Sequence, residues 1–140
     1  MKNLILLCIA LSLNSCSQND ENQKNENSIY GTWKLVAVYS NVGNGENEWN
    51  SVDNGYTYII DTDNSFESTK YNECSSGKIE VNAITNTLSF IFDCNNFYPC
   101  EENSGICKEY FSIAKGNLIL SSAYQNCDEG CPQFKFEKIK

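Results

Sequence analysis

The chain has 140 residues and a formal net charge of −8, and its basic residues are all lysine, without arginine or histidine. An acidic surface of this kind repels phosphates, so the composition argues against nucleic-acid binding. The lack of histidine also excludes a conventional Ser-His or Cys-His nucleophile. We therefore expect no catalytic residues and no enzyme.

The N-terminus carries an apolar run, Leu4–Leu13, which is preceded by the basic residue Lys2. The run is too short to span a bilayer as a helix, which takes roughly 20 residues, and is typical of a secretory signal. It ends in "LNSC", which resembles a bacterial lipobox. The resemblance implies cleavage after residues 1–15 and lipid attachment at Cys16. The alternative is an ordinary signal peptide with an incidental cysteine.

Residues 16–28 are polar and rich in asparagine, which predicts a disordered tether. The acidic "NDE" within them resembles the surface-export signal of Bacteroidetes lipoproteins. We expect an outer-membrane lipoprotein, periplasmic or surface-exposed, held to the membrane by its N-terminal lipid. Residues 29–140 have the length of one domain, which we expect to be monomeric.

Short alternating runs separated by turn residues recur through this domain, and no segment keeps a helical period. They predict eight strands: Gly31–Tyr39, Gly55–Asp61, Ser65–Tyr71, Gly77–Asn82, Thr87–Asp93, Lys108–Ala114, Asn117–Ser122 and Gln133–Ile139. Eight antiparallel strands of this length can close into an up-and-down barrel without exposed edges. The predicted fold is therefore an all-β, eight-stranded up-and-down antiparallel barrel.

The connections between these strands sort into two kinds. The second, fourth and sixth are the short sequences "TDN", "AITN" and "KG", which suit hairpin turns. The other connections hold Trp49, both prolines and six cysteines. Because successive connections alternate between the ends of an up-and-down barrel, all these residues should gather at one end, away from the tether.

An even number of cysteines in an exported domain predicts disulfides. The loops that hold them favour the pairs Cys74–Cys94, Cys100–Cys107 and Cys127–Cys131, although pairing between loops at the same end stays open. The alternative is a zinc site, but the chain offers neither histidine nor a Cys-x-x-Cys motif. We expect no metal and no cofactor.

The first strand opens with "GTWKLV" (residues 31–36), a Gly-x-Trp that resembles the first lipocalin motif. With "DNSFEST", "CSSGKIEV", "LSFIFDC" and "NCDEGCPQFKFEKI", the series is similar to the lipocalin-like lipoproteins of Bacteroidetes. The resemblance implies one calyx-like domain of no settled activity, with Trp33 closing its floor. Lipocalins set an arginine over this tryptophan; here Lys135 or Lys138 would have to replace it.

Aromatic residues are the candidate lining of a ligand cavity. The ligand-binding candidates are Trp33, Trp49, Tyr56, Tyr58, Phe90 and Phe92, and Tyr39, Tyr110, Phe134 and Phe136 could join them. An eight-stranded barrel can instead be filled by its own side chains, so an open and a filled interior are both possible. We predict binding of a small apolar or amphipathic ligand. The alternative is a protein-interaction or inhibitor domain that acts through its disulfide-stapled loops.

Overall fold

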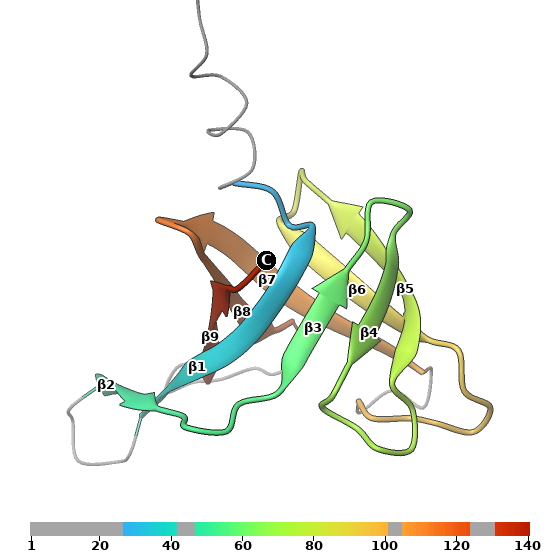
Figure 1. Cartoon of the computed structure of the whole chain (residues 1–140), viewed down its shortest axis with the longest axis horizontal. Helices are drawn as coiled ribbons and strands as arrows, with labels where there is room; N and C mark the ends of the chain where they lie inside the picture. Colours follow the sequence, from blue (N-terminus) through green and yellow to red (C-terminus); the bar gives the residue numbers. More distant parts are fainter. Residues whose placement is uncertain (1–26, 42–46, 101–104, 124–130) are drawn as a thin grey trace, which may run out of the picture.

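The computed structural model describes residues 27–41, 47–100, 105–123 and 131–140. This part of the chain is all-β (Figure 1). Its strands are β1 (Gly31–Asn41), β2 (Asn47–Ser51), β3 (Thr57–Ile60), β4 (Ser65–Ser68), β5 (Ser76–Asn82), β6 (Thr87–Phe92), β7 (Ile106–Ala114), β8 (Asn117–Ser122) and β9 (Gln133–Lys138).

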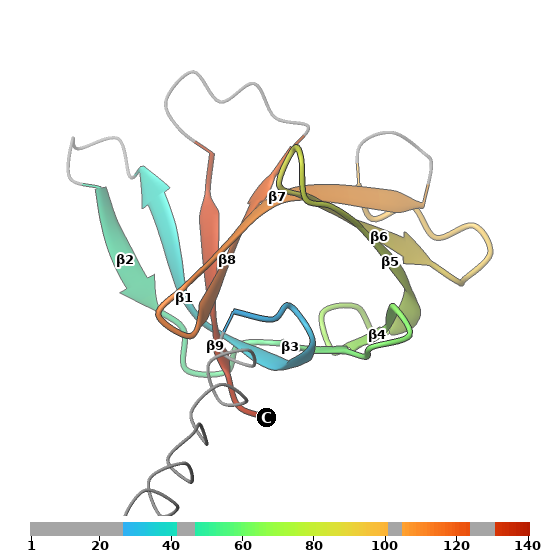
Figure 2. The same ribbon diagram turned by 90° about the horizontal axis from the view of Figure 1, so that it is seen from above.

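Eight of these strands form a closed antiparallel barrel. Sequential neighbours pair from β3 through β9, and β1 completes the ring because it pairs with β3 on one side and with β9 on the other. Figure 2 looks into this ring of strands. The predicted up-and-down barrel is confirmed, and the architecture is consistent with a lipocalin-like fold.

The tight turns lie at one end of the barrel and the long connections at the other (Figure 1). At the tight-turned end, Asn64 and Asn86 adopt positive φ values of 66° and 51°. Between β7 and β8, Lys115 and Gly116 both have positive φ, as a two-residue type I′ hairpin requires. We call this end, where β1 begins and β9 ends, the floor, and the opposite end the mouth.

The ninth strand, β2, corrects the sequence prediction, which treated Asn41–Asn54 as a loop. β2 pairs with the second half of β1, from Ala37↔Ser51 to Asn41↔Asn47, and lies outside the eight-strand closure. Its sequence "NEWNS" has a single apolar side chain and therefore lacks the apolar–polar alternation that predicts a strand. The cross-strand pair of Tyr39 and Trp49, whose ring centroids are 5.4 Å apart, supplies side-chain packing instead.

Alternation along the strands places the core inside the barrel. On β6 every second residue is buried, which gives Leu88, Phe90 and Phe92 one shared face. Gly77 on β5 occupies an inward position opposite Phe92 and Phe66. A Cβ there would lie 2.8 Å from the Phe66 ring and 2.1 Å from the Ile91 carbonyl oxygen. Only glycine therefore fits at this position.

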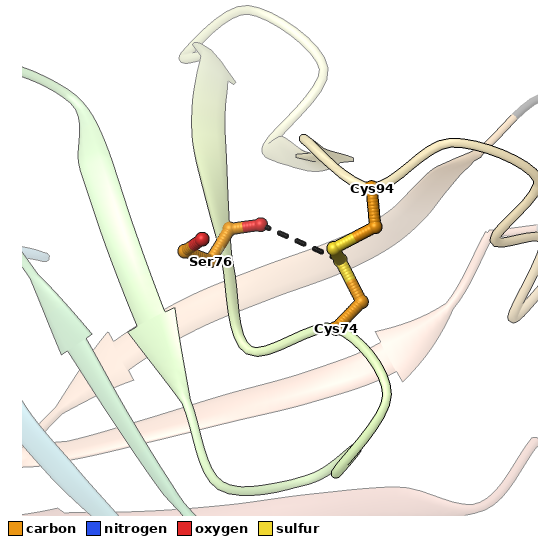
Figure 3. The surroundings of a disulfide bond; sticks show 3 residues. All are labelled: Cys74, Ser76 and Cys94. Atoms are coloured by element: carbon orange, nitrogen blue, oxygen red, sulfur yellow. Dashed lines mark hydrogen bonds between the residues drawn. A yellow bond between two sulfur atoms is a disulfide. The ribbon is translucent and has the colours of Figure 1, made fainter.

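Two disulfides staple the mouth. Cys74, before β5, is bonded to Cys94, after β6 (Figure 3), and Cys100 is bonded to Cys107 at the start of β7. Both pairs agree with the sequence prediction. Cys131 is disulfide-bonded as well, but Cys127, its predicted partner, lies outside the described residues.

The predicted signal peptide, the lipidation site Cys16 and most of the tether also lie outside the described residues. Within the residues that are described, no helix has the length and apolar character needed to cross a membrane.

Candidate ligand-binding interior

The floor of the barrel is built around Trp33, which is fully buried. Its indole nitrogen donates a hydrogen bond of 2.6 Å to the carbonyl oxygen of Ile29, which ties the segment before β1 to the ring. The Lys138 ammonium lies 5.3 Å from the centroid of the Trp33 ring and donates a hydrogen bond to the Ser28 carbonyl. Lys138, rather than Lys135, thus takes the place over the floor tryptophan.

Above the floor, buried aromatic rings pack against one another around Tyr58. The Phe90 ring stacks on Tyr58 with centroids 4.7 Å apart, and Phe136 and Tyr56 lie 5.6 Å and 5.4 Å from it. The Phe66 ring meets Phe90 edge-on at 5.2 Å. Such edge and offset contacts are the favoured geometry for aromatic pairs. This cluster fills the lower half of the interior.

A second set of rings extends the cluster toward the stapled loops. Phe92 contacts Phe66, Tyr71 and Phe97, each with centroids between 5.1 and 5.7 Å. Phe97, on the loop between the two disulfides, also packs edge-on against Tyr71 at 5.2 Å. The loop at this side of the mouth is therefore anchored on the core.

On the side of the barrel formed by β3, β8 and β9, burial decreases from the floor toward the mouth. On β9 the inward residue Phe136 is fully buried, whereas the next inward residue toward the mouth, Phe134, is only partly buried. The same step occurs from Tyr58 to Tyr56 before β3 and from Leu120 to Ser122 on β8. On this side the interior is thus closed below and partly accessible above. On β7 the order is reversed, because Cys107 near the mouth is buried whereas Ile113 near the floor is only partly buried.

A carboxyl group stands among these inward side chains. Glu109 on β7 pairs with Leu88 on one side and Ser122 on the other, so it faces the inside of the barrel. Its Oε2 atom is buried and has no hydrogen-bond partner among the described residues. Burial raises the pKa of Glu109 from 4.5 to about 7, and the positive charge of Lys70 partly offsets this effect.

Burial also raises the pKa of the two tyrosines that face Glu109. Burial raises the pKa of Tyr56 and that of Tyr58 well above 10, and the charge of Glu109 adds to both effects. The upper interior therefore combines aromatic faces with hydroxyl groups and one carboxyl group.

The Lys70 ammonium lies between two aromatic rings at the mouth. Its nitrogen is 5.4 Å from the centroid of Tyr56 and 5.1 Å from that of Tyr71. These distances are within the range of cation–π attraction. The mouth thus already holds one cation against its aromatic lining.

A β-bulge on β1 separates Trp49 from the interior. The register with β9 shifts between Leu35 and Ala37, so β1 residues beyond the bulge change faces. Tyr39 and its partner Trp49 consequently lie on the outer surface, where the Lys135 ammonium is 4.2 Å from the Trp49 ring centroid. Trp49 is 37% exposed.

The structure brings together most of the predicted ligand-binding residues. Trp33, Tyr56, Tyr58, Phe90 and Phe92 all face the interior, as do Phe134 and Phe136, whereas Trp49, Tyr39 and Tyr110 face outward.

Sequence reasoning missed Glu109 and Lys70. On β7 it named only the aromatic Tyr110 as a residue that could line the cavity, but Tyr110 is 51% exposed. The alternative phase of the strand puts Cys107, Phe111 and Ile113 on one face together with Glu109. Three apolar residues at alternate positions were the signal that could have placed the carboxyl group inside.

Neither the protein-family models nor the curated proteins include a match to this chain. Any function proposed for the chain therefore rests on the barrel and its buried aromatic cluster.

Proposed function

We propose that the protein is a lipid-anchored lipoprotein of the bacterial outer membrane, related to the lipocalin-like lipoproteins of Bacteroidetes, and that its barrel binds a small apolar or amphipathic ligand. The membrane anchor rests on "LNSC" and the polar segment that follows it. The proposed role is binding, without a catalytic step.

The binding proposal rests on inward-facing residues near the mouth, on the side formed by β3, β8 and β9, that are only partly buried. Phe134, Tyr56 and Ser122 face inward yet are only partly buried, so the upper interior offers surface that a ligand could cover. Ligand sites are typically concave and mostly apolar, with a few polar groups that fix orientation. Here the buried cluster forms an apolar base, and Glu109 and the tyrosine hydroxyls are the polar groups.

A second function, recognition of a macromolecule by the loop end, is favoured by aromatic side chains outside the barrel. Tyr98, between the disulfide-bonded Cys94 and Cys100, is 52% exposed. Trp49 is partly exposed too, although Lys135 and Tyr39 cover part of it. Phe97, in contrast, is packed on the core. The exposed aromatic side chains thus lie in two separate places, Tyr98 on the loop between the disulfides and Trp49 on β2.

Neighbouring positions on β1 provide a matched pair of variants. Val38 pairs with Phe134 and faces inward, whereas Tyr39 faces outward. Binding of N-phenyl-1-naphthylamine, an uncharged fluorescent probe of apolar sites, would be titrated with wild type, Val38→Trp and Tyr39→Trp. We expect saturable binding that Val38→Trp abolishes and Tyr39→Trp leaves unchanged.

Absence of saturable binding to the wild type would refute the ligand proposal. Equal binding by the two variants would place the probe on the outer surface and favour the loop-end function. Native mass spectrometry of the protein purified from its own host would then show whether a small molecule is retained.

A further inference from the structure

The unpaired carboxyl oxygen of Glu109 requires an explanation. A buried polar atom without a partner destabilises the fold, so such atoms are rare in native proteins. Glu109 lies on the inner face of the barrel wall, between Leu88 and Ser122, and its Oε2 atom is buried although the side chain as a whole is partly exposed. An acceptor held in this position suits a ligand that brings its own hydrogen-bond donor.

The groups that face Glu109 define which donor fits. They are the phenol groups of Tyr56 and Tyr58 and the ammonium group of Lys70, which in turn rests on the rings of Tyr56 and Tyr71. The rings of Tyr56 and Tyr71 present faces to a cation. Lys70 is the positive charge that acts on the Glu109 carboxylate. Its ammonium group rests against the rings of Tyr56 and Tyr71, however, and does not hydrogen-bond to the Glu109 Oε2.

We propose that Glu109, together with the rings of Tyr56 and Tyr71, forms a head-group subsite for an amphiphile that carries a primary ammonium group. The inference rests on the proposed ligand-binding function and adds the chemical class of the ligand. The apolar chain lies on the buried aromatic cluster, and the ammonium donates to the orphan carboxyl oxygen. Lys70 holds the cation position between the two rings until the ligand displaces it.

Charge favours an ammonium over other head groups. A carboxylate head would meet the Glu109 carboxylate at close range, and a hydroxyl head would donate a hydrogen bond without neutralising the charge. A primary ammonium supplies both the donors and the charge, and hydrogen bonds between charged partners are the stronger kind. The chain's net charge of −8 also attracts cations.

Isothermal titration at pH 8 with decylammonium, 1-decanol and decanoate would test the subsite, because these probes share a chain and differ only in the head. We expect decylammonium to bind most tightly and decanoate most weakly. Glu109→Gln should lower the decylammonium affinity by about tenfold or more and the decanol affinity much less, because the amide oxygen still accepts a hydrogen bond from a hydroxyl but forms no ion pair. Glu80→Gln, which removes an exposed carboxylate from the outside of β5, should change neither affinity.

A Lys70 variant and the pH dependence of decylammonium affinity give two further tests of the subsite. Lys70→Met should raise the decylammonium affinity, because no internal cation then has to leave the rings, whereas Lys78→Met on the outer surface should not. For wild type, the decylammonium affinity should rise about tenfold from pH 6 to pH 8 as Glu109 ionises, while the probe stays protonated. Glu109→Gln should abolish this dependence.

The outcomes separate the two proposals. If none of the three probes binds, both the calyx function and the subsite are refuted. If decanol binds as tightly as decylammonium, or if Glu109→Gln lowers both affinities equally, the calyx stands and the ammonium subsite is refuted.

Discussion

Replacement of Glu109 by glutamine should stabilise the fold, and the gain should depend on pH. In the folded protein burial raises the pKa of Glu109 from 4.5 to about 7. The folded state therefore binds a proton more tightly than the unfolded state does. The associated stability is fully present below about pH 4.5 and is lost as the pH rises through about 7.

The size of the effect follows from the two pKa values. Each pKa unit corresponds to about 1.4 kcal/mol, so ionisation of the buried carboxyl destabilises the wild type by about 3 kcal/mol above pH 7. Glutamine has nearly the same shape and carries no charge at any pH. Glu109→Gln should thus match the wild type at pH 4.5 and exceed its free energy of unfolding by about 3 kcal/mol at pH 8.

The assay is urea unfolding of both proteins at the two pH values, followed by tryptophan fluorescence with the disulfides intact. Comparison of variant with wild type at each pH removes the contribution of the other carboxyl groups. The exposed Glu80→Gln serves as the control and should give the same free-energy difference at both pH values. A pH-independent difference for Glu109→Gln would refute the buried-carboxyl reasoning.

Three further predictions concern the anchor, the tryptophans and a disulfide. Cys16→Ser should abolish lipid labelling and release the protein from membranes; a variant that still sediments with them would contradict the lipobox interpretation. Trp33 should be shielded from iodide and Trp49 quenched in single-tryptophan variants, and Trp33→Ala should lower the free energy of unfolding by about 3–5 kcal/mol. Replacing Cys74 and Cys94 by alanine should lower it by about 3 kcal/mol, as measured by urea unfolding.

The barrel was predictable because its strands obey simple local rules. "TLSFIF" alternates apolar and polar residues, and Lys115–Gly116 suits a two-residue hairpin. Both signals depend only on residues next to each other in the chain. Counting connections along the chain then placed the cysteine loops at one end, and the observed bonds Cys74–Cys94 and Cys100–Cys107 agree with that placement.

The interior was harder to predict because it depends on register. One extra residue at the bulge between Leu35 and Ala37 turns Tyr39 outward, and Trp49 follows it through pairing with β1. The position of Glu109 likewise depends on which of two phases β7 adopts. Sequence preference alone puts a glutamate outside, and only packing against β6 and β8 selects the phase that buries it.

The hydrogen bonds at Trp33 and Lys138 also determine how the barrel bears mechanical load. A force applied at Ser28 and directed away from the mouth runs along β1, which is bonded on both sides, to β3 and to β9. Interstrand bonds lie across the strand direction, so such a force shears many of them at once and cannot open them one by one. A protein pulled from its N-terminus should therefore resist unfolding at the very strand that closes its barrel.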